Sequence, residues 1–134
     1  IRLLKFEIAR DHTLYFALEA FLLADAPPYL ALSYTWGPAE ESEFARRNAA
    51  QLKHDEPPKP CTVIVNGSTV QVTANLNDFF RHYEAHVDSA NYASLHIWID
   101  ALCINQSDRI EKAVQVMQMD RVYSCAQCVV VWLG

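Results

Sequence analysis

The chain has 134 residues, 51% of them hydrophobic, which suits one domain that buries about two-thirds of the surface of its unfolded chain. Its 16 acidic and 11 basic residues give a net charge of −5 without a Lys/Arg stripe, which argues against nucleic acid as the primary partner. Apolar stretches such as residues 14–23 are far shorter than the roughly 20 residues of a membrane span, so we predict no transmembrane segment and no signal peptide.

The first part of the chain contains two strand candidates and one ambiguous segment. Residues 1–6 form a short apolar strand candidate, and residues 29–34 (YLALSY) indicate a buried strand that Gly37 and Pro38 end. Residues 14–23 mix aromatic and aliphatic side chains without a clear period, so strand and helix both remain open there. The exit of the 29–34 strand is one wall of a candidate site.

The middle of the chain combines a surface insertion, a hairpin and a helix. From residue 39 to 60 the composition turns charged and rich in Ala and Pro, which indicates a surface insertion. Residues 62–72 predict a β-hairpin, because Asn66-Gly67 tolerates the positive φ angles of a type I′ turn. Asn75 is predicted to cap a helix over residues 76–87. That helix is expected to pack on the sheet through residues at helical spacing, namely Leu76, Phe79, Phe80 and Tyr83.

Residues 95–134 carry the most informative pattern, a strand, a polar loop, one amphipathic helix and a second strand. Together these elements predict a βαβ unit. The unit places polar side chains at the carboxyl end of a strand, where open α/β sheets keep their ligand sites. These side chains are Asp100, Cys103, Asn105 and Gln106.

The helix of this unit has a predicted cap and a predicted apolar face. Asp108 is expected to cap it, and Glu111, three positions later, to reach back to the Asp108 N–H as in a capping box. A wide apolar stripe is expected to face the core, with the two methionines as core filling. The stripe consists of Ile110, Val114, Met117 and Arg121, with Ala113, Val116 and Tyr123 beside them.

Several of these polar residues have both a functional and a structural interpretation. The helix N-terminus, close to Asp100 and Asn105, offers a place for a phosphate or carboxylate. Asp100 could bind a ribose hydroxyl or accept hydrogen bonds from the backbone of residues 103–106. Glu111 has a sufficient structural role in the capping box. Cys103 has no histidine near it in sequence, so we predict a small buried thiol rather than a nucleophile.

The four cysteines, Cys61, Cys103, Cys125 and Cys128, are too few and too apolar in context for a secreted disulfide scaffold. We therefore expect reduced thiols and a cytoplasmic protein. The last two form a CxxC pair, but no second CxxC or CxxH completes a zinc site. His82 and His86 share a helix face without a third ligand, so we predict no metal site.

Three blocks of the sequence resemble the fungal heterokaryon incompatibility (HET) domain. They are IRLL at the start, YLALSYTWG at residues 29–37, and IWIDALCINQSDRIEKAVQVMQMDRVYSCAQCVVVWLG at residues 97–134. The hairpin around VNG and the pair Asn75-Leu76 also fit the family's order. The resemblance covers essentially the whole chain, which we expect to be a single HET domain, residues 1–134, cut from a longer protein.

The resemblance implies a cell-death effector or signalling domain of fungal non-self recognition, acting through a protein partner or self-association. The family is considered similar in fold to Toll/interleukin-receptor (TIR) domains. We therefore expect an α/β layered domain of TIR-like or flavodoxin-like type, with a central, mostly parallel sheet and a β-hairpin insertion. Some TIR domains cleave NAD, so the alternative is an NAD glycohydrolase whose NAD depletion kills the cell.

The enzymatic alternative names specific residues, with NAD as substrate and no cofactor. Glycoside cleavage needs a carboxylate beside an oxocarbenium-like charge, and Glu111 or Asp100 would supply it. The ligand-binding groups would be Trp36 and Tyr34 as a stacking wall, with Ser33, Asn105 and Gln106 as hydrogen-bonding groups. If the 29–37 block corresponds to the first TIR strand, however, the TIR catalytic glutamate falls after residue 134.

A non-catalytic interaction module would differ from an enzyme in its surface. A module exposes apolar side chains on an outer helix face, whereas an enzyme converges polar groups on one pocket. The deciding observation is whether Asp100, Asn105, Glu111 and Trp36 face a common cleft.

Overall fold

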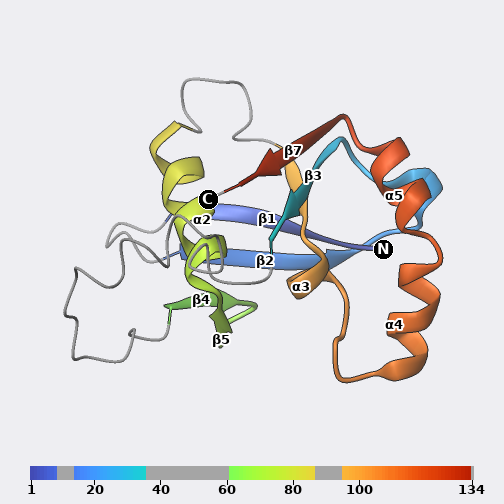
Figure 1. The fold of residues 1–134 in the computed structure, drawn as a ribbon, viewed down its shortest axis with the longest axis horizontal. Coiled ribbons are helices and arrows are strands. Elements are labelled where there is room, and N and C mark those ends of the chain that lie inside the picture. Colours follow the sequence, from blue (N-terminus) through green and yellow to red (C-terminus); the bar gives the residue numbers. More distant parts are fainter. Residues whose placement is uncertain (9–13, 36–60, 87–94, 134) are drawn as a thin grey trace, which may run out of the picture.

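A computed structural model describes residues 1–8, 14–35, 61–86 and 95–133 of the chain (Figure 1). Within these residues seven strands form one sheet in the order β5-β4-β2-β1-β6-β3-β7. The strands are β1 (Arg2–Ile8), β2 (Leu14–Ala20), β3 (Tyr29–Tyr34), β4 (Cys61–Val65), β5 (Ser68–Val72), β6 (His96–Trp98) and β7 (Cys128–Trp132). The helices are the short 3₁₀ turn η1 (Leu23–Asp25), α2 (Ala74–His86), α3 (Asp100–Cys103), α4 (Arg109–Val116) and α5 (Met119–Cys125).

The sheet is mixed. Strands β6, β3 and β7 run parallel, as do β2 and β4, whereas β1 pairs antiparallel with β2 and β6, and β4 pairs antiparallel with β5. The α/β class and the attached hairpin are confirmed, but parallel pairing does not dominate the sheet. The reason is the long hairpin of β1 and β2, which pairs from Arg2 with Ala20 to Ile8 with Leu14.

That hairpin also decides the ambiguous segment near the N-terminus. Residues 14–20 form a strand, because every one of them pairs across β1, and Leu14 and Phe16 turn their side chains into the core. The predicted 62–72 hairpin is confirmed as β4 and β5, with φ angles of +48° at Asn66 and +77° at Gly67. Asn66 also fixes this turn against β2, because its Oδ1 accepts a hydrogen bond from Leu18 N–H at 2.9 Å.

Helix α2 is confirmed, but its predicted cap is wrong. The helix begins at Ala74, and the Leu76 N–H donates to Thr73 Oγ1 at 3.2 Å, so Thr73 provides the side-chain acceptor. Asn75 lies inside the first turn and is only 4% exposed. The predicted core residues of α2 are all buried, namely Leu76, Phe79, Phe80 and Tyr83.

Helices α2 and α5 lie on opposite faces of the sheet. Tyr123 of α5 meets Trp98 of β6 edge-on, with ring centroids 5.4 Å apart, and Trp98 aligns through Ala31 with Val129 of β7. Trp132, three residues after Val129, points to the other face and contacts Phe79 of α2. Helices α5 and α2 therefore cover opposite faces of the sheet.

The terminal βαβ unit is confirmed in outline and differs in two details. The strands β6 and β7 run parallel but are not neighbours, because β3 lies between them. The predicted single helix is two, α4 and α5, separated at Met117 and Gln118.

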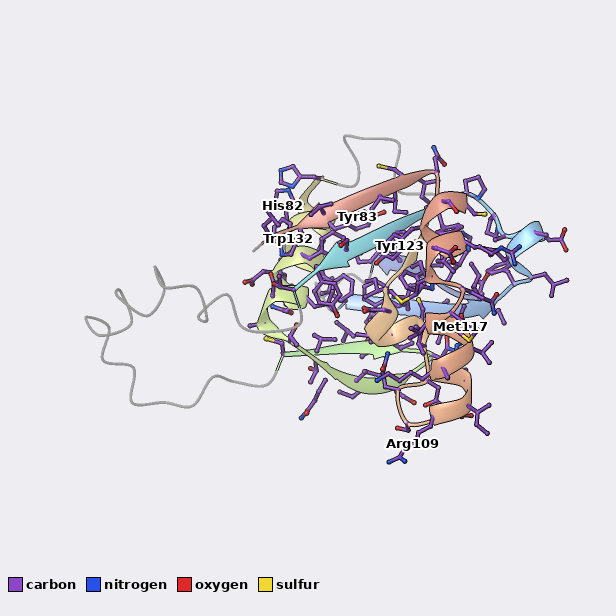
Figure 2. The ribbon with its side chains drawn as sticks, turned by 45° about the vertical axis from the view of Figure 1, so that its right-hand side comes forward. His82, Tyr83, Arg109, Met117, Tyr123 and Trp132 are labelled. Atoms are coloured by element: carbon purple, nitrogen blue, oxygen red, sulfur yellow. The ribbon has the colours of Figure 1, made fainter. Side chains whose placement is uncertain are left out.

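The apolar stripe of α4 was expected to face the core, and this expectation is wrong. No residue of α4 is buried, and its large apolar side chains are exposed, Ile110 at 79%, Val116 at 51% and Val114 at 47%. Met117, just after the end of α4, is 82% exposed. Core packing in this unit comes from α5, whose Val122 is fully buried. Figure 2 shows Arg109 at the start of α4 and Met117 just after its end, both away from Tyr83 and Tyr123.

Candidate functional site

The polar loop after β6 is held together by its own backbone and by Gln106. The Asp100 carbonyl oxygen accepts hydrogen bonds from Ile104 N–H at 3.2 Å and from Gln106 Nε2 at 2.8 Å. The Asp100 carboxylate accepts from the N–H of Ala101 at 2.7 Å. Asp100 therefore does shape the loop, as one of its two interpretations proposed, but it uses its main-chain oxygen to do so.

Asp108 caps α4 as predicted. Its Oδ1 accepts hydrogen bonds from the N–H groups of Ile110 at 2.9 Å and Glu111 at 3.1 Å. The second predicted hydrogen bond of the capping box is wrong. The Asp108 N–H donates to the Asn105 carbonyl and not to the Glu111 side chain.

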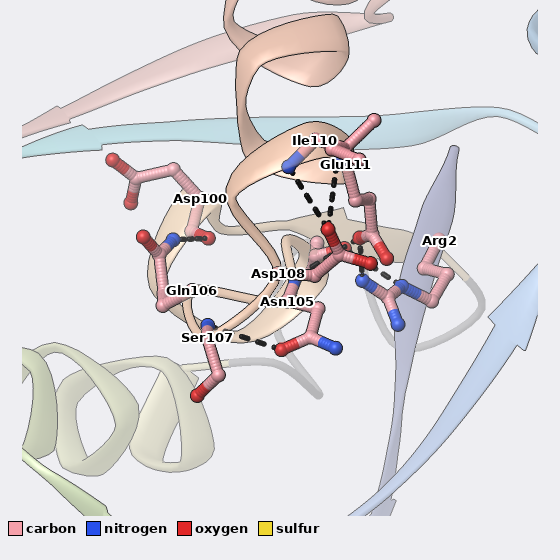
Figure 3. A network of polar contacts seen from close by, with 9 residues as sticks. Arg2, Asp100, Asn105, Gln106, Ser107, Asp108, Ile110 and Glu111 are labelled. Atoms are coloured by element: carbon pink, nitrogen blue, oxygen red, sulfur yellow. Dashed lines mark hydrogen bonds and ion pairs between the residues drawn. The ribbon is translucent and has the colours of Figure 1, made fainter.

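Glu111 is the centre of a separate network that ties α4 to β1. Its Oε1 accepts a hydrogen bond from Asn105 N–H at 2.9 Å and forms an ion pair with Arg2 Nη2 (Figure 3). Arg2 also donates from Nε to the Cys103 carbonyl at 2.9 Å. Glu111 thus has a structural role that links the first strand to the polar loop. Sequence reasoning missed Arg2, because it lies 109 positions from Glu111 and no local pattern connects them.

The two candidate carboxylates do not face one cleft. In Figure 3 the Asp100 carboxylate points away from Glu111, across the loop that separates them. Asp100 belongs instead with two phenols at the carboxyl end of β3. Burial, and then the nearby Asp100 charge, raise the pKa of Tyr34 and of Tyr123 above the ordinary value of 10.0.

The remaining predicted ligand-binding residues are divided between these groups. Ser33 precedes Tyr34 on β3, and both are half-buried. Asn105 joins the Glu111 network through its N–H, while its Oδ1 accepts from the Ser107 N–H at 3.1 Å. Gln106 lies on the Asp100 side of the loop, bonded to the Asp100 carbonyl. Trp36 lies outside the described residues.

An open pocket of about 580 Å³ lies beside the Glu111 network. Its lining combines apolar residues from the ends of β1 and β2 with the polar side of α4. The lining residues are Ile1, Arg2, Ala20, Phe21, Leu22, Glu111 and Gln115. The Glu111 carboxylate in this pocket already forms an ion pair with Arg2, so the geometry favours a structural role over general acid catalysis.

A third polar cluster joins α2 to the carboxyl ends of β3 and β7. Asn75 Nδ2 donates to the Thr35 carbonyl at 3.1 Å and to Thr35 Oγ1 at 2.9 Å. The Trp132 indole N–H donates to Asn75 Oδ1 at 2.8 Å and to its carbonyl at 3.1 Å. Sequence reasoning noticed Asn75 but assigned it to the helix cap, which hid its role between two strands.

Replacing Glu111 with glutamine is expected to lower the free energy of unfolding by about 1 kcal/mol, because the ion pair with Arg2 is lost while an amide oxygen can still accept from Asn105. Urea denaturation measures the change. Lys112→Gln, which removes one charge from the neighbouring exposed residue, is the control and should stay within about 0.5 kcal/mol of the wild type. An unchanged stability for Glu111→Gln would contradict a structural role for this carboxylate.

Cys103 is expected to resist alkylation. Its side chain is 2% exposed, and burial raises the pKa of its thiol to about 12, although the Ile99 N–H that donates to its sulfur acts in the opposite direction. Iodoacetamide at pH 8 should modify the exposed Cys125 and Cys128 first and reach Cys103 only after denaturant is added, as peptide mass spectrometry can show. Equal modification rates in the folded protein would contradict this burial.

The raised pKa of the Cys103 thiol determines how its contribution to the stability of the folded protein changes with pH. The thiol stays neutral in the folded protein above the pH at which it ionises in the unfolded chain. Cys103 therefore favours folding fully below the ordinary thiol pKa of 9.0, and this contribution is lost as the pH rises through the folded value of about 12.

The described residues contain neither a metal-binding cluster nor a membrane-spanning helix. Across residues 1–8, 14–35, 61–86 and 95–133, no group of three or more His, Cys, Asp or Glu side chains is placed to hold a metal ion. His82 and His86 stack with ring centroids 4.2 Å apart on α2. Among the helices that the structure describes, none has the length and apolar character needed to cross a bilayer.

Comparison with protein families matches residues 29–134 to the family described as heterokaryon incompatibility protein (HET). The chain belongs to the HET family. Along its whole length it is 34% identical to heterokaryon incompatibility protein 6, OR allele, of Neurospora crassa, and it spans 18% of that relative's length. No solved structure matches the chain. The resemblance carried by YLALSYTWG and the long C-terminal block is therefore confirmed at the level of the HET family.

Proposed function

We propose that this HET domain is a cytoplasmic effector of fungal non-self recognition, which triggers cell death by assembling with a protein partner or with itself. Membership of the HET family supports the recognition role. One observation carries the assembly mechanism. Ile110 and Val114 of α4 and Met117, just after its end, form an exposed row that we call the α4 apolar row. Exposed apolar side chains that lie together along one side of a helix are typical of a protein contact surface.

Induced expression in a filamentous fungus tests this proposal. The chain is expected to reduce the fraction of viable cells, counted with a vital dye. A variant with Ile110→Asp and Met117→Asp should remain folded, because both side chains are exposed, and should lose the effect. Lys112→Glu introduces a carboxylate elsewhere on α4 and should kill like the wild type. Full killing by the double aspartate variant would exclude the α4 apolar row as the contact that matters.

One observation favours a second function, NAD cleavage of the TIR type. Burial, and then the charge of the nearby Asp100 carboxylate, raise the pKa of Tyr34 and Tyr123, and this cluster lies at the carboxyl ends of parallel strands. A carboxylate beside aromatic rings is a chemical environment suited to a nicotinamide riboside. The test measures NAD loss with purified protein and with Asp100→Asn and Glu111→Gln. Turnover that only Asp100→Asn abolishes would support this function, and no turnover by the wild type would oppose it.

A further inference from the structure

The α4 apolar row has the spacing of a helix–helix contact. Ile110, Val114 and Met117 are separated by four and three residues, so they lie along one side of the helix. Exposing large apolar side chains to water is unfavourable. A second helix with apolar residues at the same spacing would cover all three side chains at once.

Two charged side chains of opposite sign lie next to the two ends of this row. Arg109 precedes the row at the start of α4, and Asp120 follows it in the first turn of α5. Both side chains are exposed. Figure 2 shows Arg109 at the outer end of α4, with its guanidinium directed away from the fold.

We propose that the partner of the α4 apolar row is a second copy of this chain, packed antiparallel about a two-fold axis near Val114. Antiparallel packing places Arg109 beside the partner's Asp120, and the symmetry makes the same contact twice. Parallel packing would instead bring each Arg109 close to the partner's Arg109. Charge complementarity therefore selects the antiparallel pair.

The neighbouring charges agree with this arrangement. Asp108 lies beside Arg109, and Arg121 lies beside Asp120, so each end of the row carries one acid and one base in the same chain order. In the antiparallel pair Asp108 faces the end that carries the partner's Arg121. The contact is small compared with the roughly 800 Å² per partner of a stable dimer, so the association is weak and depends on concentration.

This inference rests on the proposed function, because it specifies the partner in the assembly step. Sedimentation equilibrium of the 134-residue chain over a range of concentrations tests it directly. The wild type should fit a monomer–dimer equilibrium. Arg109→Glu and Asp120→Arg should each weaken dimerisation roughly tenfold, because each creates two like-charge contacts. The double variant, with both charges exchanged, should return to within about threefold of the wild type.

Lys112→Glu is the matched control. It makes the same charge change as Arg109→Glu on the same helix, but residue 112 lies about 200° around α4 from Ile110, on the side away from the row. Its dimerisation constant should match that of the wild type. Circular dichroism of every variant checks that the fold is intact.

Three results would overturn the inference. They are a chain that stays monomeric at the highest concentration, a dimer unaffected by either single substitution, and single variants that the charge exchange does not restore. A monomeric chain that still kills fungal cells would reject this contact and leave the proposed function standing. A charge-dependent dimer that causes no loss of viability would support this contact and reject the proposed function.

Discussion

Trp98→Ala is expected to destabilise the domain by about 3–5 kcal/mol, because truncating a fully buried tryptophan leaves a large cavity in the core. Trp98 lies on β6, between the paired strands β1 and β3, and its ring packs edge-on against Tyr123 of α5. Its loss would therefore weaken the attachment of the α5 crossover to the sheet. Guanidinium denaturation followed by circular dichroism measures the change.

Trp98→Phe is the informative control for that result. The indole N–H is buried and has no hydrogen-bond partner among the described residues. Phenylalanine keeps most of the apolar contact and removes this unpaired donor, so its cost should be only about 1 kcal/mol. A loss as large as that of alanine would show that the indole N–H is satisfied and contributes to stability.

Asn75→Ala is expected to lower the free energy of unfolding by about 2–3 kcal/mol. Asn75 is buried and has direct hydrogen bonds with both Thr35, just after β3, and Trp132, at the end of β7. Alanine removes one of the two acceptors of the Trp132 indole N–H and both bonds to Thr35. Chemical denaturation gives the stability, and the fluorescence of Trp132 should report greater exposure of that ring in the folded variant.

Thr35→Val separates the two halves of this cluster. It removes the Oγ1 acceptor but keeps the Thr35 carbonyl, to which Asn75 also donates, and it leaves the contact with Trp132 intact. The expected cost is below about 1 kcal/mol. If Thr35→Val destabilised the protein as much as Asn75→Ala, the contact with Trp132 would not be the major contribution of Asn75.

The elements that sequence alone predicted well are those with strong local signals. Asn66-Gly67 fixed the hairpin because few other pairs tolerate its φ angles, and Asp108 was identified because a cap depends only on the next three residues. Helix α2 was predicted because its four apolar side chains follow one face. Each of these signals is contained within a single turn or helix.

The incorrect predictions concern features that depend on contacts between segments far apart in the sequence. The apolar stripe of α4 predicted burial, yet nothing in a helical pattern says whether the sheet or the solvent covers that side. Glu111 was assigned to the capping box, but Arg2 from the first strand provides its ion pair. The mixed character of the sheet depends on which strand lies next to β1, and local sequence does not encode that choice.

In the candidate site, too, the local features were predicted correctly and the long-range contacts were not. The sequence located the polar residues of the loop after β6, but it grouped Asp100 with Glu111 because both follow the same strand. In the folded domain Asp100 lies near Tyr34, whereas Glu111 faces the start of β1. Which polar groups meet is decided by the path of the loop, and this path depends on hydrogen bonds such as that from Gln106 to the Asp100 carbonyl.

The position of β3 has a consequence for how the domain is made on the ribosome. The hairpin of β1 and β2 can form as soon as its residues leave the exit tunnel, because all of its pairing is local. Strand β3 is apolar, and both of its neighbours, β6 and β7, are translated more than 60 residues later. Both edges of β3 therefore stay unpaired while residues 35–95 are translated, when an apolar strand is prone to pair with another chain. A nascent HET domain of this kind should depend on chaperones that bind extended apolar segments until its C-terminal strand emerges.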